Sequence, residues 1–427
     1  MKCAFYTLGC KVNQYESAAM AEDLVKNGFT CVSPSEDADV YIINSCSVTA
    51  ESDRKTRQAV RRLRNNHPDS IIVLTGCMTQ ATPSTEKELP EADIVMGNKN
   101  NDCLYGLILR FIRSRKRDVE IDPHMTGDKF RGKTVSAYSE KTRAIVKIED
   151  GCNRFCSYCI IPYARGRVRS KPVEDIRKEV TDLANNGYKE VVLVGINLSA
   201  YGTDIGSDMV EAVRTAAEVD GIERVRLGSL EPDHITDIII SGLSQIKEFC
   251  PQFHISLQSG CDKTLKRMNR HYNSVEYEDL CTNLRAVFPD VTLTTDVMVG
   301  FPGETDSDYE ISLDFVKKTA FEKVHVFPYS RRPGTPAARM SDQVDNSVKQ
   351  HRTEIMIDET EKIRQTFLKN QIGKTLEIIS EENHGGTFRG YTANYTPVKV
   401  KGSCRCGEII KVKIIGVDGD FCIGEPV

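Results

Sequence analysis

The sequence lacks any long apolar run. No stretch of its 427 residues approaches the about 18 consecutive apolar residues that span a bilayer. The N-terminus, Met-Lys-Cys-Ala-Phe, also lacks the apolar segment of a signal peptide. We therefore expect a protein of the cytoplasm with no membrane partner. Neither sign of charge dominates, because 57 basic residues stand against 61 acidic ones, so overall charge neither favours nor excludes a nucleic-acid partner.

Cysteine is too sparse for a disulfide scaffold. The chain has 15 cysteines in 427 residues, well under the about 8–10% of disulfide-rich proteins. In a reducing compartment, surplus cysteines indicate metal binding, catalysis or packing. The hydrophobic content of 40% and the charged content of 28% are typical of a globular protein, and the length allows about two to four domains.

Three cysteines fall in one short stretch, residues 151–159, which we call the three-cysteine loop. Cys152, Cys156 and Cys159 have the spacing C-x3-C-x2-C, and no His or other Cys lies within the twenty residues on either side. A structural zinc site or a fully ligated [4Fe–4S] cluster requires a fourth ligand. The pattern therefore favours a cluster with one open iron. A zinc site completed from a distant part of the chain, or a loop of free thiols, is the alternative.

This spacing resembles the signature of the radical SAM enzymes. In that family, S-adenosylmethionine chelates the open iron, and an electron from the cluster cleaves it to a 5′-deoxyadenosyl radical. Tyr158, next to the last ligand, resembles the family's aromatic residue near the adenine of the cofactor.

The first hundred residues alternate between apolar runs and helical patterns. Runs at 4–9, 40–44, 71–76 and 94–96 predict βαβ units with a parallel sheet. Cys10, Cys46 and Cys77 each follow one of these runs, and the carboxyl ends of parallel strands share one rim where ligands bind. Chance placement of a commonly buried residue is the alternative, but the small and polar neighbours suit an exposed rim. The pattern predicts a second metal site.

Three segments then resemble the N-terminal domain of the methylthiotransferases. They read Thr-Leu-Gly-Cys-Lys-Val-Asn-Gln-Tyr-Glu at 7–16, Ile-Asn-Ser-Cys-Ser-Val-Thr at 43–49 and Gly-Cys at 76–77. The resemblance implies that Cys10, Cys46 and Cys77 hold an auxiliary [4Fe–4S] cluster whose open iron carries the sulfur to be inserted. The stretch Phe-Pro-Tyr-Ser-Arg-Arg-Pro-Gly-Thr-Pro-Ala-Ala at 327–338 also resembles this family.

The central segment has six strand-like runs, at 145–148, 191–195, 225–227, 254–257, 293–299 and 324–327. Six βα units are two short of a complete barrel, so we expect an open, partial barrel with its site at the carboxyl ends. Polar side chains at these ends are candidates for binding S-adenosylmethionine, although any one of them alone is more often a turn or cap residue. With Tyr158, the candidates are Asn197, Ser229, Glu231, Gln258 and Asp296.

Polar and apolar residues alternate after Gly373, which predicts a small β-barrel of about five strands. Its length and place resemble the RNA-binding TRAM domain. Basic residues on this barrel and on one face of an earlier helix are candidate RNA contacts, although a charged helical face is most often only solvated. They are Arg54, Arg57, Arg61 and Arg64 on the helix, and Lys399, Lys401, Lys411 and Lys413 on the barrel.

The predicted fold class is α/β, in four parts. Residues 1–112 form an open parallel sheet domain with the auxiliary cluster, and residues 113–137 form a linker. Residues 138–370 form a partial (β/α)6 radical SAM barrel, and residues 371–427 form an antiparallel barrel of the TRAM type.

The resemblance implies a radical SAM methylthiotransferase with two [4Fe–4S] clusters and S-adenosylmethionine. The wording at 7–17 and 151–170 is most similar to the class that acts on N6-threonylcarbamoyladenosine at position 37, in the anticodon stem-loop of tRNA. That class inserts sulfur at adenine C2 and methylates it, with an external electron donor and sulfur source. Isopentenyladenosine-37 of tRNA and an aspartate of a ribosomal protein are alternative substrates. An iron–sulfur electron carrier and a zinc RNA-binding protein are remote alternatives.

Overall fold

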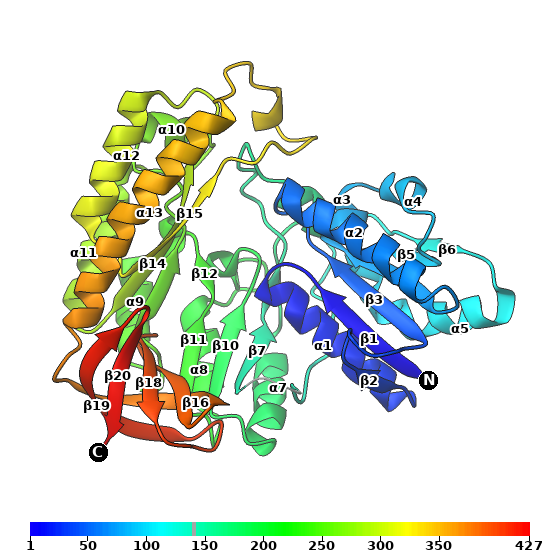
Figure 1. Ribbon diagram of the computed structural model, residues 1–427, viewed down its shortest axis with the longest axis horizontal. Helices are drawn as coiled ribbons and strands as arrows, with labels where there is room; N and C mark the ends of the chain where they lie inside the picture. The colour runs from blue at the N-terminus through cyan, green and yellow to red at the C-terminus, as the bar shows by residue number, and fades with distance from the viewer. Residues whose placement is uncertain (139–141) are drawn as a thin grey trace.

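The computed structural model describes residues 1–138 and 142–427. Figure 1 shows three parts in chain order: a sheet with helices on both faces, a larger open barrel beside it, and a small β-barrel below the strands of the larger one. The expected α/β class is confirmed. None of the helices in the described ranges is both long and apolar enough to cross a membrane.

The first sheet has six parallel strands in the order β2-β1-β3-β4-β5-β6. The four predicted runs are β1 (Lys2–Thr7), β3 (Val40–Ser45), β4 (Ile71–Gly76) and β5 (Ile94–Met96). The two edge strands, β2 (Thr30–Val32) and β6 (Asp118–Glu120), were missed because each has three residues and little apolar character. Since β6 pairs with β5, the sheet extends past residue 112 into the segment predicted as linker.

Helices cover both faces of this sheet. On one face, α1 (Lys11–Lys26) and α5 (Leu104–Ser114) enclose an apolar cluster that includes Leu24 and Ile108. On the other face, α2 (Ala50–Asn66) and α3 (Cys77–Ala81) pack through Val60, Leu63 and Met78. The short α4 (Thr85–Glu88) and the 3-10 helix η1 (Asn98–Cys103) lie in the connections. Because both faces are covered, every residue of β3 and β4 is buried and these strands read as continuous apolar runs.

The open barrel consists of two parallel sheets. One has the order β11-β10-β7, and the other β12-β13-β14-β15. All six predicted runs are strands: β7 (Arg143–Lys147), β10 (Glu190–Val194), β11 (Arg224–Leu227), β13 (Gln252–Ile255), β14 (Thr292–Val299) and β15 (Lys323–Pro328). The two-residue β12 (Ser229–Leu230) adds to them, and β8 (Glu149–Asp150) pairs with β9 (Arg169–Ser170) around the three-cysteine loop. The partial barrel is confirmed.

Helices surround the outside of the barrel and bury one large core. They are α7 (Val173–Asn185), α8 (Met209–Ala217), α9 (Asp237–Ser244), α10 (Asp262–Arg267), α11 (Ser274–Val287), α12 (Asp306–Thr319) and α13 (Asn346–Lys369). The short α6 (Ile161–Arg165) packs instead against α3 of the first domain. Three 3-10 turns accompany them: η2 (Leu198–Ala200), η3 (Pro232–His234) and η4 (Ala337–Arg339).

The C-terminal strands close into a five-stranded barrel in the order β16-β17-β18-β20-β19, which confirms the predicted barrel. It is not wholly antiparallel as predicted, because β18 and β20 pair in parallel. They are β16 (Thr375–His384), β17 (Thr387–Thr392), β18 (Pro397–Lys401), β19 (Ile409–Asp418) and β20 (Phe421–Pro426). Arg226 of β11 joins this barrel to the larger one. Its guanidinium pairs with Glu190 at 2.9 Å and donates to the carbonyl oxygens of Ala393 at 2.9 Å and Thr392 at 3.3 Å.

We predict that Arg226→Met destabilises the fold by about 3–5 kcal/mol, because it leaves the fully buried Glu190 and two carbonyls without this donor. The matched control Arg177→Met removes only an exposed ion pair with Glu218 and changes stability by at most about 1 kcal/mol. Urea denaturation of both variants measures the difference. Equal effects would contradict a structural role for Arg226.

Candidate functional site

Three cysteines of the first sheet meet at its carboxyl rim. Cys10 follows β1, Cys46 follows β3 and Cys77 begins α3 directly after β4. Because these strands are neighbours, the thiols gather around one amide: the sulfurs of Cys10 and Cys77 each lie 3.9 Å from Asn13 Oδ1. A Cβ placed on Gly9, next to Cys10, would lie 2.9 Å from Cys46 Sγ. The structure therefore brings together three thiols that are far apart in sequence.

Two glycines allow the chain to turn beside the cysteines. Gly76 has a φ of +104°, and a Cβ there would lie 2.4 Å from the carbonyl oxygen of Ser45. Gly151 has a φ of +94°, and its Cβ would lie 1.9 Å from the carbonyl oxygen of Arg167. No other residue fits either position, so the close backbone approach at Cys77 and at the three-cysteine loop depends on glycine.

The three-cysteine loop follows β8 at the carboxyl side of the barrel. Two backbone N–H groups donate hydrogen bonds to cysteine sulfurs. In the loop, the N–H of Arg154 donates to Cys152 Sγ at 3.5 Å, and just after the loop the N–H of Ile161 donates to Cys159 Sγ at 3.4 Å. Hydrogen bonds to the ligand sulfurs are a regular feature of protein-bound iron–sulfur clusters. The backbone of this loop is therefore already arranged around its sulfur atoms.

Arg270, which no sequence motif indicated, also contacts this loop. Its guanidinium donates to Cys156 Sγ at 3.3 Å and forms an ion pair with Glu231, one of the residues predicted to bind S-adenosylmethionine. Burial raises the pKa of Glu231, although Arg270 acts in the opposite direction. Arg270 was not predicted because it lies after α10 in a stretch without a sequence motif. Nothing in the sequence there indicates its contacts with distant residues.

Both cysteine triads fit a cluster with three protein ligands. Burial raises the pKa of Cys77 and of Cys152 to about 12, so these groups are thiols until a metal displaces the proton. Within residues 1–138 and 142–427, no three His, Cys, Asp or Glu side chains lie close enough to bind a single metal ion. A four-iron cubane is wider than one ion, and its ligands lie correspondingly further apart.

A buried ion network connects the two triads. Arg165, whose side chain is 1% exposed, follows the three-cysteine loop but reaches into the first sheet domain. It donates to Asn13 Oδ1 at 2.7 Å, to Glu16 Oε2 at 2.9 Å and to Cys77 Sγ at 3.3 Å. Lys147 Nζ lies 2.9 Å from Glu16 and 3.2 Å from Asp150. Burial opposes ionisation of Asp150, but Lys147 and Arg165 still hold its pKa well below the ordinary value.

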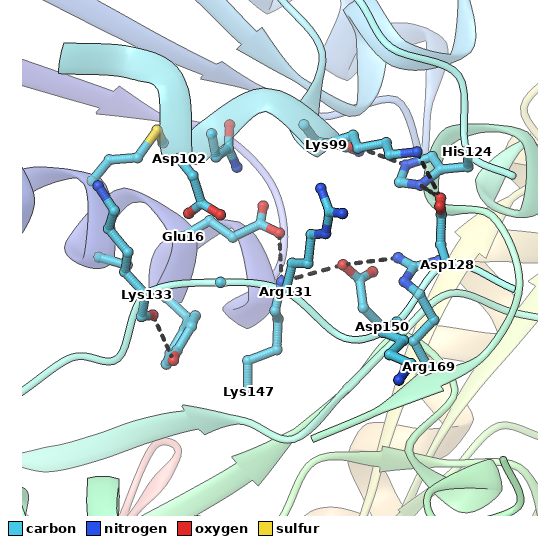
Figure 2. Close-up of a pocket in the computed structure, with 17 residues that line it drawn as sticks. Glu16, Lys99, Asp102, His124, Asp128, Arg131, Lys133, Lys147, Asp150 and Arg169 are labelled. Atoms are coloured by element: carbon cyan, nitrogen blue, oxygen red, sulfur yellow. Dashed lines mark hydrogen bonds and ion pairs between the residues drawn. The ribbon is translucent and has the colours of Figure 1, made fainter. Parts of the chain in front are cut away.

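Figure 2 shows the outer side of this network, where Glu16, Lys147, Asp150 and Arg169 surround a small pocket. Its volume of about 60 Å³ suits water rather than a nucleoside. Its lining comes from both halves of the molecule, so this pocket lies at the contact between them.

A larger cavity of about 950 Å³ is lined by residues that follow Cys46 and by Tyr158, next to Cys159. Residues 48–51, directly after Cys46, form one side, and Tyr158 of the three-cysteine loop, with Gln258 and Asp296, forms another. Two polar atoms on its wall, Gln258 Oε1 and Tyr329 Oη, are buried and have no hydrogen-bond partner in the described part of the chain. We call this space the junction cavity; such unpaired groups are expected where a ligand binds.

The remaining predicted cofactor residues lie around the junction cavity. Ser229 lines an adjoining cavity of about 910 Å³, which also contains Cys10 and shares Asp296 with the junction cavity. Asn197 is buried below the barrel rim, where its N–H donates to Glu149 Oε2 at 2.7 Å and its Oδ1 has no described partner. Tyr158, Gln258 and Asp296 therefore line the junction cavity itself, whereas Ser229 and Asn197 are not part of its lining.

The predicted arginine stripe on α2 is engaged with acidic groups. All four side chains pair within the first domain: Arg54 with Glu51 at 2.6 Å, Arg57 with Glu88 at 3.0 Å, Arg61 with Glu91 at 3.4 Å, and Arg64 with Asp93. Their charge is largely compensated, which favours the alternative of a solvated face. RNA contact through this helix stays a prediction.

The lysines of the small barrel differ from one another. Lys399 pairs with Asp418 at 3.4 Å, and Lys411 lies 3.9 Å from Glu377. Lys401 and Lys413 form no ion pair with any residue in the described ranges. Lys413 is the cross-strand partner of Glu425, so of the four lysines Lys401 carries the charge with least compensation.

Two family profiles match the chain. Residues 2–97 match an uncharacterized protein family, UPF0004, and residues 146–316 match the Radical SAM superfamily. A threonylcarbamoyladenosine tRNA methylthiotransferase, MtaB, of Bacillus subtilis (strain 168) is 39% identical over 99% of this chain and 96% of its own length. A tRNA-2-methylthio-N(6)-dimethylallyladenosine synthase of Pelotomaculum thermopropionicum is 37% identical over 91% of this chain and 88% of its own length. The chain belongs to the radical SAM methylthiotransferases.

As a radical SAM methylthiotransferase, the protein is a transferase that uses S-adenosylmethionine and a [4Fe–4S] cluster. The remote alternatives of an electron carrier and a zinc protein are therefore wrong. Among solved structures, the radical S-adenosylmethionine methyltransferase TsrM of Kitasatospora setae superposes with a TM-score of 0.57. The match covers 79% of this chain and 74% of TsrM at 14% identity, so it shows the fold alone.

We predict that Arg165→Met destabilises this methylthiotransferase by about 3–5 kcal/mol, because Glu16 and Asp150 lose a buried cationic partner. The control Arg167→Met changes a neighbouring, exposed arginine and leaves stability within about 0.5 kcal/mol. Urea denaturation measures both. A loss no larger than that of the control would show that the network does not hold the two halves together.

Proposed function

We propose that the protein converts N6-threonylcarbamoyladenosine at position 37 of tRNA into its 2-methylthio derivative, by sulfur insertion at adenine C2 and methylation from S-adenosylmethionine. The observation that carries the proposal is the junction cavity, which has residues adjoining one cysteine triad on one side and Tyr158 of the other triad opposite. Such a cavity holds one substrate atom within reach of two cofactor sites. Relatives named for threonylcarbamoyladenosine, at 39% and 38% identity, support the choice of nucleoside.

Two cofactor sites follow from the donor sets. Cys152, Cys156 and Cys159 would hold the cluster that binds S-adenosylmethionine, and Cys10, Cys46 and Cys77 would hold an auxiliary [4Fe–4S] cluster. When bound, these groups supply a 5′-deoxyadenosyl radical for removing the hydrogen from C2, and the sulfur that replaces it. An external one-electron donor and a sulfur source are required.

The chain's own residues position and shield these groups. Arg165 and Asn13 orient the auxiliary thiols, and Arg270 orients Cys156. Tyr158, Gln258 and Asp296 line the cavity where S-adenosylmethionine would lie, with Glu231, Ser229 and Asn197 around it. Because residues of two domains line the cavity, a base taken out of its stack and bound there is shielded from much of the solvent, which protects a radical.

The small barrel is the proposed contact for the anticodon stem-loop, and Lys401, whose charge is the least compensated of the four lysines, is the strongest candidate. Positive charge that faces no carboxylate is available to phosphate. The four arginines of α2 are weaker candidates because each has an acidic partner. The tRNA substrate and the reduced thiols suit the cytoplasm.

The two-cluster assignment predicts the result of removing one triad. A variant with Cys10, Cys46 and Cys77 all replaced by Ala loses about half of the iron of the anaerobically reconstituted protein. It still cleaves S-adenosylmethionine to 5′-deoxyadenosine under reductant, but forms no methylthio product. Replacing the exposed Cys103 by Ala serves as the control and leaves iron content unchanged. Full iron content in the triple variant would refute the auxiliary cluster.

The substrate assignment is tested with modified tRNA. The reconstituted enzyme is incubated anaerobically with S-adenosylmethionine, sulfide and reductant, and with threonylcarbamoyl- or isopentenyl-modified tRNA, and nucleosides are analysed by mass spectrometry. We expect a methylthio product on the threonylcarbamoyl nucleoside only. Product on the isopentenyl nucleoside would reassign the substrate, and cofactor cleavage without either product would indicate a protein substrate.

A further inference from the structure

Two cations that line the junction cavity have no carboxylate within ion-pair distance in the described part of the chain, although Asp345, one turn before Lys349, partly offsets the charge of that lysine from further away. Lys349, near the start of α13, and Arg331, just after β15, both line the cavity. Neither forms an ion pair with any residue of 1–138 or 142–427. Most other cations near the site are paired, including Arg332 with Asp53 at 2.9 Å. Unpaired cations in a recess point to an anionic ligand.

The side chain of Lys349 is held in place before any ligand binds. Its aliphatic stem crosses Gly300, where a Cβ would lie 2.2 Å from Lys349 Cγ. Its ammonium lies 3.5 Å from the carbonyl oxygen of Tyr329 and 5.7 Å from the centre of that ring. Burial lowers the pKa of Lys349, and the charge of Asp345 offsets this effect only in part. A pre-positioned side chain loses less entropy when it binds a ligand.

A buried phenol lies beside the lysine. Tyr329 is 3% exposed, lines the junction cavity, and its hydroxyl has no hydrogen-bond partner in the described ranges. Burial raises the pKa of Tyr329, so the hydroxyl keeps its proton and can donate. Arg331 is anchored through its Nε, which donates to the carbonyl oxygen of Ala338 at 2.8 Å. Two cations and one donor therefore surround one part of the cavity.

The acidic residues of the cavity do not supply the missing charge. Glu51 pairs with Arg54, Asp296 lies 3.2 Å from His254, and Glu354 accepts from Gln350 at 3.0 Å. Glu354 keeps its charge, because its partner is an uncharged amide, but none of the three carboxylates lies within ion-pair distance of Lys349 or Arg331.

We propose that Lys349, with Tyr329 and Arg331, binds the carboxylate of the threonylcarbamoyl group and so selects this nucleoside over the uncharged isopentenyl one. The inference rests on the proposed function, since it names the residues that read the modified base in the same cavity. A carboxylate accepts several charge-assisted hydrogen bonds, which an alkenyl tail cannot replace. A site built for such a group rejects an analogue without it, because its own polar atoms are left unpaired.

The test combines a change in the protein with a change in the substrate. Anticodon stem-loop RNAs carry either threonylcarbamoyladenosine or its carboxyl methyl ester, and product formation is measured with wild type and Lys349→Met. We expect the wild type to prefer the free acid by at least about tenfold in kcat/KM. In Lys349→Met, the KM for the acid rises by about ten- to a hundredfold, kcat changes little, and the preference for acid over ester disappears.

Three comparisons make the result decisive. Lys362→Met, on the exposed side of the same helix, keeps the wild-type preference. Lys349→Arg retains a preference for the acid, which shows that charge is the property required. The iron content of anaerobically reconstituted Lys349→Met stays at the wild-type value, and reports a folded, loaded enzyme.

Two outcomes would overturn the inference and one would overturn its premise. If Lys349→Met keeps the wild-type preference for the acid, Lys349 does not read the carboxylate. If the variant loses cleavage of S-adenosylmethionine while Lys362→Met does not, the lysine serves the cofactor instead. If the wild type forms no product on threonylcarbamoyl RNA, the proposed function itself fails.

Discussion

The buried ion network around Arg165 holds the first sheet domain against the barrel. Charges withdrawn from water are tolerated only when they are paired with good geometry. Glu16 comes from the first sheet domain, Lys147 and Asp150 come from the barrel, and Arg165 follows the three-cysteine loop. Their pairing fixes how the two halves meet. The same guanidinium reaches Cys77, so a residue of the barrel orients a thiol of the other half.

Both halves are parallel α/β structures, and both direct the carboxyl ends of their strands toward the contact between them. Ligands gather at such ends because the loops that follow each strand converge there. Both cysteine triads therefore lie at the rims that meet, and Arg165, just after the three-cysteine loop, contacts Cys77 of the other half. The junction cavity is formed only where the two rims meet, since its lining comes from both.

The basic residues of the molecule differ in whether a carboxylate lies close enough to compensate their charge. On the outer face of α2 every arginine of the stripe has an acidic partner, so its charge is used within the domain. Inside the junction cavity Lys349 and Arg331 have no such partner among the described residues. The arginines that the sequence predicted as RNA contacts are thus paired with carboxylates. Lys349 and Arg331, which were not predicted as site residues, line an open cavity instead. Charge compensation, and not composition, distinguishes the two cases.

Most of the strands, the cysteines at their ends and the family could be predicted from the sequence. The apolar runs of β3 and β4 and the spacing of Cys152, Cys156 and Cys159 are visible within short windows, because burial and ligation impose them locally. Which distant side chains meet is set by the tertiary fold. The edge strands β2 and β6, the partners of Arg165 and Arg270, and the unpaired Lys349 all depend on contacts between residues far apart in the chain. Such contacts leave no periodic pattern in the sequence, because each hydrogen bond or ion pair joins two residues that lie far apart in the chain.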